Sequence, residues 1–154
     1  MSSKGNSTIT TNRRARYDYE IVDTVEAGLV LTGTEIKSVR DRKVSLSDSY
    51  ARPVDGEMWL HNLHIDEYAP AHRNNHEPKR PRKLLLHSDE ILQLSKQVDQ
   101  RGLTLVPLRL YIRNHKAKLE LAVARGKKRF DKRRALIERE REREARAAIG
   151  ARRY

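Results

Sequence analysis

The sequence predicts a mainly β domain with inserted helices, closed into a small barrel and followed by a basic C-terminal tail. Short runs of alternating apolar and polar side chains recur between turn residues, which is typical of short strands. Of the 154 residues, 37% are hydrophobic and 35% are charged. The chain can therefore fill one modest core, and part of its length is expected to lie outside that core.

The N-terminal part is expected to supply the first strands and a short helix. Residues 1–11 are rich in Ser and Thr with little apolar content, so we expect them to be disordered. Aromatic and aliphatic side chains alternate with polar ones over residues 17–23, which indicates a strand, and Gly28 permits a turn after it. Thr34 is the expected cap of a short helix that has Glu35 in its first turn.

The middle of the chain suggests a β-meander, a basic loop and a second helix. Two strand-like runs, 44–54 and 57–65, are separated by an Asp-Gly pair that suits a hairpin turn. Residues 69–82 contain three prolines and four Lys/Arg, so we expect a loop that displays basic side chains. A helix is predicted over residues 88–102, capped by its first serine and stopped by its last glycine.

The clearest alternation, over residues 108–113 and 119–123, predicts the last pair of strands. The leucines just before this pair are out of phase with it. The shift falls at Val106 and Pro107, where a bulge or bend would let the strand curl around a small barrel. Six or so short strands with two inserted helices therefore favour an OB-type barrel over residues 12–124.

Residues 125–154 form a basic tail with 13 Lys/Arg and 5 Asp/Glu, a net charge of +8 out of +12 for the whole chain. These residues favour a helix, but Leu136, Ile137 and Ile149 form no continuous stripe that could be buried. We expect the tail to be disordered alone and helical when phosphates neutralise its Arg and Lys. A solvated charged helix tethered to the domain is an equally supported alternative.

Composition and motifs narrow the class of protein. A net charge of +12 favours polyanions such as nucleic acid, and a chain without Cys fits a cytoplasmic protein and excludes Cys-ligated zinc. His61 and His64 lie three apart on an expected strand and point to opposite faces, which argues against a metal site. We find no catalytic or cofactor motif, signal peptide or membrane-length apolar run. We therefore expect no catalytic residues, no cofactor and no enzymatic activity.

Asn12 and Glu26 are the best candidates for reading bases. A carboxylate accepts from the N–H groups of a guanine edge, and an amide can pair with adenine or guanine. The nearby side chains suited to stacking or phosphate contact are Arg13, Arg14, Arg16, Tyr17 and Tyr19. On spacing alone, Glu26 as a turn residue before Gly28 and Asn12 as an exposed cap are the stronger interpretations.

Seven motifs in one collinear order, within residues 12–142, resemble the SmpB family of tmRNA-binding proteins. They are NRRAR at 12–16, EAG at 26–28, GTEIKS at 33–38, DSYA at 48–51, RKLLL at 82–86, RGKK at 125–128 and DKR at 131–133. The number of motifs makes the resemblance specific.

The resemblance implies trans-translation, in which tmRNA is delivered to the A site of a stalled ribosome, the ribosome is rescued and the nascent chain is tagged. The barrel would bind the tRNA-like domain of tmRNA. The tmRNA-binding residues implied by similarity are Asn12, Arg13, Arg14, Arg16, Tyr19, Glu26, Tyr50, Lys83 and Leu85. The residues alone would instead assign Leu85 to a strand or the core.

The resemblance also implies that the tail becomes helical in the empty mRNA channel, beside small-subunit ribosomal RNA at the decoding centre. The matching tail residues are Lys127, Lys128, Phe130, Asp131, Lys132 and Arg133. Phe130 replaces a usual Tyr or His, so it can stack on a base but cannot transfer a proton. Tyr17 replaces a common His in the same way.

Further partners are implied through the RNA: EF-Tu and alanyl-tRNA synthetase would be contacted indirectly, by way of tmRNA. We expect a cytoplasmic monomer with no membrane partner. Two other functions stay open on composition. One is a ribosomal RNA-binding or ribosome-assembly module, in which Asn12, Glu26 and Leu85 would have no special role. The other is an RNA-processing enzyme, for which the sequence offers no convergent titratable groups.

Overall fold

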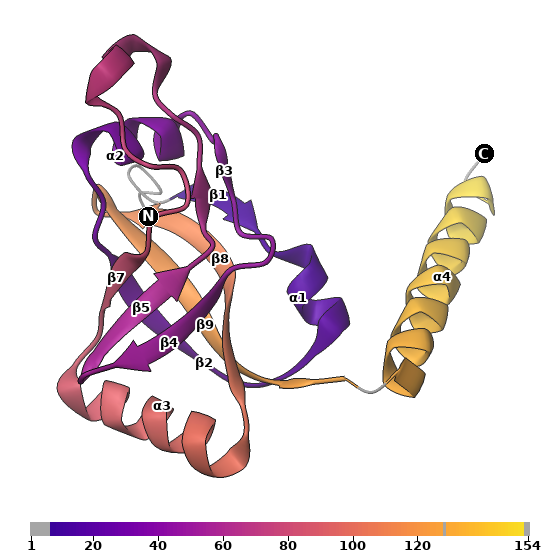
Figure 1. Cartoon of the computed structure of the whole chain (residues 1–154). Helices are drawn as coiled ribbons and strands as arrows, with labels where there is room; N and C mark the ends of the chain where they lie inside the picture. Colours follow the sequence, from indigo (N-terminus) through magenta and orange to yellow (C-terminus); the bar gives the residue numbers. More distant parts are fainter. Residues whose placement is uncertain (1–6, 128, 153–154) are drawn as a thin grey trace.

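The structure, a computed structural model, describes residues 7–127 and 129–152, without the side chains of residues 129–132, 134–135 and 149–152. Its main feature is a ring of antiparallel strands paired in the order β8, β4, β5, β7, β2, β9 and back to β8. Their bounds are β2 Tyr19–Leu29, β4 Tyr50–Val54, β5 Glu57–His61, β7 Arg82–Leu85, β8 Thr104–Arg113 and β9 Lys116–Gly126. The ring, drawn in Figure 1, confirms the predicted fold class.

The remaining strands and helices lie outside this ring of strands. Strand β1 (Ser7–Thr11) pairs with β8, and β3 (Val44–Ser45) pairs with β6 (His64–Ile65) in a separate small sheet. The helices are α1 Arg13–Asp18, α2 Gly33–Arg40, the 3-10 helix η1 Ala69–Asn74, α3 Ser88–Arg101 and α4 Arg129–Arg152. In Figure 1, α2 and α3 lie at opposite ends of the barrel, and α1 and α4 lie to one side of it.

Aliphatic side chains fill the barrel interior, as the alternation over the last two strands predicts. Leu110 on β8 and Leu119 and Leu121 on β9 are fully buried. A second, smaller apolar cluster lies under α1; its buried members are Ala15, Val106, Leu108, Ala122 and Ala124. The two clusters use opposite faces of β8, and its register with β9 shifts between Pro107 and Arg109. This irregularity confirms a bulge in this strand but places it at Leu108, just after the predicted Val106 and Pro107, so that Leu108 faces α1 and Leu110 faces the interior.

The N-terminal predictions need two corrections. Residues 7–11, expected to be disordered, form β1, because Ile9 is buried against the barrel and the flanking threonines suit a strand. Residues 17 and 18, expected in a strand, close helix α1 instead, and β2 begins at Tyr19. The Asn12 side chain caps this helix by accepting a hydrogen bond from the Ala15 N–H.

Both longer helices of the domain are present, but their caps differ from those predicted. Helix α2 is capped by Thr32 in a reciprocal capping box with Glu35, whereas the predicted cap, Thr34, bonds to His76. Helix α3 begins at Ser88, but it is the N–H of the preceding residue that donates to the Glu90 carboxylate. Its predicted stop is confirmed, since Gly102 has a φ of 64°.

The two central strand runs are shorter than predicted. Asp48 (φ 64°) and Asn62 (φ 63°) adopt left-handed conformations that interrupt them, which separates β3 from β4 and β5 from β6. The predicted hairpin turn is present, with φ values of 49° at Asp55 and 78° at Gly56. The expected loop over residues 69–82 contains η1, and its last residue, Arg82, begins β7.

The basic tail forms the long helix α4, and Leu136 and Ile137 are 42% and 49% exposed, so the described side chains of this helix form no buried apolar stripe. The structure therefore shows the tail in the helical conformation that the sequence predicts for its bound state. Its disorder in the absence of RNA stays a prediction.

A peptide of residues 125–154 is expected to show little helix alone and a strong helical signal with RNA, measured by circular dichroism. The reason is that the described side chains of α4 form no apolar packing face, and like charges at i,i+4, such as Glu138 and Glu142, nearly cancel the opposite charges at i,i+3, since each pair contributes only about 0.2–0.5 kcal/mol. The induced helix should be lost at high salt, which screens phosphate contacts. Stable helicity without RNA would instead support the solvated charged helix.

Candidate nucleic-acid interface

Glu26 lies on the outer surface of the barrel, in a cluster that three neighbouring strands build. The β2–β9–β8 registers place Glu26 opposite Glu120 and Glu120 opposite Arg109. The Glu26 carboxylate accepts a hydrogen bond from the Tyr111 hydroxyl and one of 2.8 Å from Arg113. Both bonds end on Oε2, and no described residue donates to Oε1. That oxygen can therefore accept from a bound base.

The cluster keeps Glu26 ionised. The hydrogen bond from Tyr111 holds the pKa of the Glu26 carboxyl below its ordinary value, and the charges of Arg113 and Lys118 act in the same direction, against burial. Burial and the neighbouring carboxylate raise the pKa of Tyr111 to about 12, so its hydroxyl remains a donor. At neutral pH the site presents an anionic acceptor in a fixed orientation.

Three members of this cluster were missed from sequence. Arg109 lies over the ring of Tyr111, with 4.2 Å from its guanidinium carbon to the ring centroid, and Arg113 is the second cation that holds Glu26. A cavity of about 290 Å³ opens here; its lining includes Ser7, Thr8, Glu26, Arg109, Tyr111 and Arg113. The alternation of cation, aromatic and cation on the outward positions of β8 was the available signal.

Leu85 lies on the same outer surface, next to the Glu26 cluster. It is opposite Gly28, two residues beyond Glu26 on β2, and it is 55% exposed. A Cβ built on Gly28 would lie 3.2 Å from the Leu85 Cβ, so the glycine allows the leucine to lie flat against the strand. Lys83, two residues before Leu85, forms an ion pair of 2.5 Å with Glu57. Leu85 is therefore a surface residue of this face and is not part of the core.

Asn12 is not part of this cluster. Its Oδ1 caps α1, and its Nδ2 donates to the carbonyl oxygens of Pro107 (3.0 Å) and Leu46 (3.4 Å). The amide thus ties α1 to the bulge of β8, and its hydrogen bonds are committed to the backbone. A separate cavity of about 290 Å³ brings together four predicted residues: Asn12, Arg14, Tyr19 and Tyr50.

The remaining predicted residues lie toward the tail. Arg13, Arg16 and Tyr17 on α1 share a cavity of about 380 Å³ with side chains of α4, among them Glu138 and Glu142. This cavity is the place where the barrel domain and the tail helix meet.

Few of the predicted tail residues have described side chains. Lys127 donates from its backbone N–H to the Asp18 carbonyl and from Nζ to the Arg16 carbonyl, so it continues the barrel rather than the tail helix. Arg133 is exposed on α4. Lys128 lies outside the described residues, as do the side chains of Phe130, Asp131 and Lys132.

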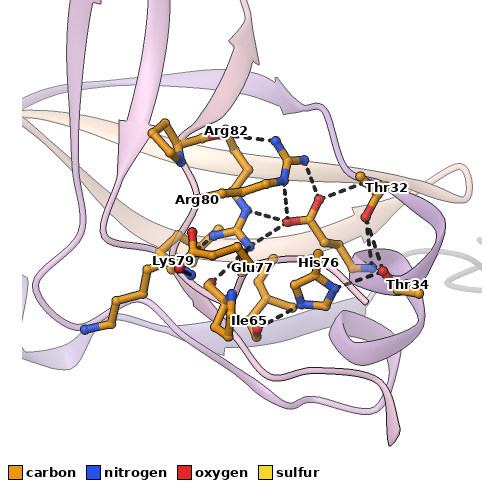
Figure 2. A network of polar contacts seen from close by, with 12 residues as sticks. Thr32, Thr34, Ile65, His76, Glu77, Lys79, Arg80 and Arg82 are labelled. Atoms are coloured by element: carbon orange, nitrogen blue, oxygen red, sulfur yellow. Dashed lines mark hydrogen bonds and ion pairs between the residues drawn. The ribbon is translucent and has the colours of Figure 1, made fainter. Parts of the chain in front are cut away.

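A buried polar network fixes the strand that carries Lys83 and Leu85. Glu35 on α2 and Arg82 on β7 are both fully buried and form an ion pair of 2.5 Å, and Arg80 also donates to Glu35. Figure 2 shows Arg80 and Arg82 converging from one side of this network and His76 bridging Thr34 and Ile65. Burial alone would raise the pKa of the Glu35 carboxyl, but its hydrogen bonds from Arg80, Thr32 and Arg82 hold the pKa below its ordinary value.

Two further observations concern the histidines and the helices. Within the part of the chain that the structure describes, no three His, Asp or Glu side chains gather in a way that could hold a metal ion. His64 instead pairs with Asp66 at 2.8 Å.

None of the described helices combines the length and apolar character that crossing a membrane requires.

Fold and surface together define a small β-barrel protein with a basic, aromatic-bearing face of the kind that binds RNA. The model of the SmpB protein family matches residues 9–151. The chain belongs to the SmpB family. An SsrA-binding protein of Acidothermus cellulolyticus is 57% identical over 96% of this chain and 93% of its own length, and that of Thermobifida fusca is 55% identical over 97% and 94%.

A solved structure gives the same assignment. It has a TM-score of 0.67 and 49% sequence identity, and the match covers 82% of this chain and 93% of that chain. It was described under the heading "tmRNA-SmpB: a journey to the center of the bacterial ribosome".

Proposed function

We propose that this protein binds tmRNA, the SsrA RNA for which its relatives are named, and delivers it to the A site of stalled ribosomes for trans-translation. The barrel, residues 12–124, recognises the tRNA-like domain, and the tail, residues 125–154, enters the empty mRNA channel. EF-Tu and alanyl-tRNA synthetase take part through the RNA. The protein acts by binding in the cytoplasm and carries out no chemical step. The names of the relatives and the ribosomal neighbour support this function.

The observation that carries the proposal is the Glu26 cluster. An exposed carboxylate is costly for a protein that binds a polyanion, because it repels phosphate. Here Tyr111 and Arg113 hold it ionised and oriented, which suits an acceptor for the N–H groups of a base edge. Leu85 lies beside it and offers an apolar surface on which a nucleoside can pack. Asn12 contributes by holding α1 and its arginines in place.

Replacing Glu26 with Ala is expected to weaken binding of the tRNA-like domain by about 2–3 kcal/mol, as measured by filter binding or fluorescence anisotropy. The loss has this size because a charge-assisted hydrogen bond to the base disappears and its donor stays unpaired. Glu20→Ala is a matched control, since Glu20 is an exposed carboxylate on the same strand that faces Arg125 at 3.6 Å. It should leave affinity unchanged or slightly higher.

Equal affinity of the Glu26→Ala variant and the unaltered chain would favour the other candidate function. The protein would then be a ribosomal RNA-binding or ribosome-assembly module, whose barrel needs only its positive charge.

A further inference from the structure

Trp59 stands on the outside of the barrel and is not itself among the proposed tmRNA contacts, although its cross-strand neighbour Lys83 is one of them. Its neighbours on β5, Met58 and Leu60, are fully buried, so the alternation of the strand turns the indole outward. The side chain is half-buried. In Figure 1, β4 and β5 form the front of the barrel, and none of the described helices crosses in front of them.

Two cations flank this indole. The strand registers place Arg52 of β4 on one side of Trp59 and Lys83 of β7 on the other. Directly opposed residues on adjacent strands have Cβ atoms about 4.5–5.5 Å apart, so the three side chains form one row across the strands. Arg52 is exposed, and no described carboxylate lies within ion-pair distance of it. Lys83 bonds to Glu57, but both side chains are more than two-fifths exposed, so a phosphate can compete for the ammonium group.

The row is continuous with two sets of residues already assigned to RNA. On β7, Leu85 follows Lys83 on the same outer face. On β4, Tyr50 precedes Arg52 on that face and stacks on His61, with ring centroids 5.3 Å apart and an angle of 22° between the rings. The Trp59 row therefore joins the Leu85 side of the barrel to the Tyr50 side.

We propose that Trp59 stacks on an unpaired base of the bound RNA, while Arg52 and Lys83 contact the phosphates on either side of that base. An aromatic face between two cations matches the alternation of base and phosphate along a single strand. The charges favour RNA over a protein partner. The whole chain has a net charge of +12, and this part of its surface has two cations, Arg52 and Lys83, and one carboxylate, Glu57. The inference rests on the proposed function and adds Trp59 and Arg52 to its RNA footprint, between Leu85 and Tyr50.

Trp59 is the only tryptophan of the chain, so its fluorescence reports on this site alone. Titrating the full-length protein with the tRNA-like domain of tmRNA should quench the emission of Trp59 and protect it from iodide. Binding of the same RNA is followed in parallel by the anisotropy of a label on the RNA. Normal binding with unchanged emission would overturn the Trp59 inference and leave the proposed function standing. An absence of RNA binding would contradict both the Trp59 inference and the proposed function.

Variants give a second, independent test. Trp59→Ala should weaken binding about 5- to 150-fold, the range expected for loss of one stacked base, whereas Trp59→Phe should retain most of the affinity. Leu92→Ala is the control, because Leu92 is 58% exposed on α3 and does not belong to the row. Equal losses in the Ala and Phe variants, or none in either, would contradict stacking. Thermal unfolding of each variant verifies that the barrel is intact.

Discussion

A chain that ends at Gly126 is expected to bind the tRNA-like domain of tmRNA with most of its affinity and to support no tagging on stalled ribosomes. The barrel core is complete without the tail, because its buried residues lie between Ile9 and Val123. Ending at Gly126 also keeps the last pairing of β9, with Tyr19. The tail supplies the part of the protein that we propose to enter the mRNA channel, and nothing in the barrel can replace it there.

Two measurements test this division of roles. RNA affinity is measured at several salt concentrations, and tag addition is followed in a reconstituted translation system with ribosomes stalled on a truncated message. The shortened chain lacks 12 Lys/Arg and 5 Asp/Glu, so the salt dependence of its affinity should be weaker. The full-length Glu26→Ala variant is the reciprocal control, with weakened binding and an intact tail. Loss of tmRNA binding on truncation would contradict the proposed division.

Replacing Glu35 with Ala is expected to destabilise the barrel by roughly 3–5 kcal/mol, measured by urea unfolding. The substitution leaves Arg82 fully buried without its carboxylate and removes the partner of Arg80 and the reciprocal cap of α2. A loss of this size is a large share of the roughly 5–15 kcal/mol that typical domains have in total. Glu57→Ala is the control: its ion pair with Lys83 is exposed, so at most about 1 kcal/mol should be lost.

The same carboxylate gives the stability a defined dependence on pH. The pKa of Glu35 is lower in the folded protein than its ordinary value, so its contribution is complete above the unfolded pKa of about 4.3. That contribution is lost as the pH falls through the lower pKa of the folded state. A Glu35→Gln variant should therefore lose less stability than the unaltered chain between neutral and acidic pH. If the free energy of unfolding fell equally with pH in the two proteins, other carboxyl groups would be responsible for the pH dependence.

The strands could be predicted where alternation and turn residues agree. The last two strands, their bulge and the Asp55 turn were found because their patterns are local. Helix α1 was missed because it has only six residues, and the alternation of Tyr17, Tyr19 and Ile21 continues through it into β2. The helix is stabilised by the Asn12 cap and by the packing of α1 on β8. Packing between segments that are distant in the chain leaves no local sequence pattern, so it could not be predicted.

The candidate site was predicted less completely than the fold. Composition and motif order indicated the RNA-binding class and Glu26, but not the hydroxyl and guanidinium groups that orient its carboxylate. Tyr111 and Arg113 are 85 and 87 residues away in the chain, so only strand pairing brings them to Glu26. Leu85 shows the reverse error, since an apolar residue in a strand suggested the core, whereas the register with Gly28 places it on the surface.

The bulge in β8 has a consequence for how this surface tolerates change. Strand β8 pairs with β1, β4 and β9, and the bulge lies between the half that supports α1 and the half that carries Tyr111. Leu108 is the extra residue of the bulge, because Pro107 pairs with Leu121 and Arg109 with Glu120. Deleting Leu108 would therefore restore regular pairing and leave Arg109, Tyr111 and Arg113 on the outer face, while helix α1 would lose an apolar contact of the smaller cluster. The support of α1 and the proposed RNA contacts can therefore evolve separately at this position.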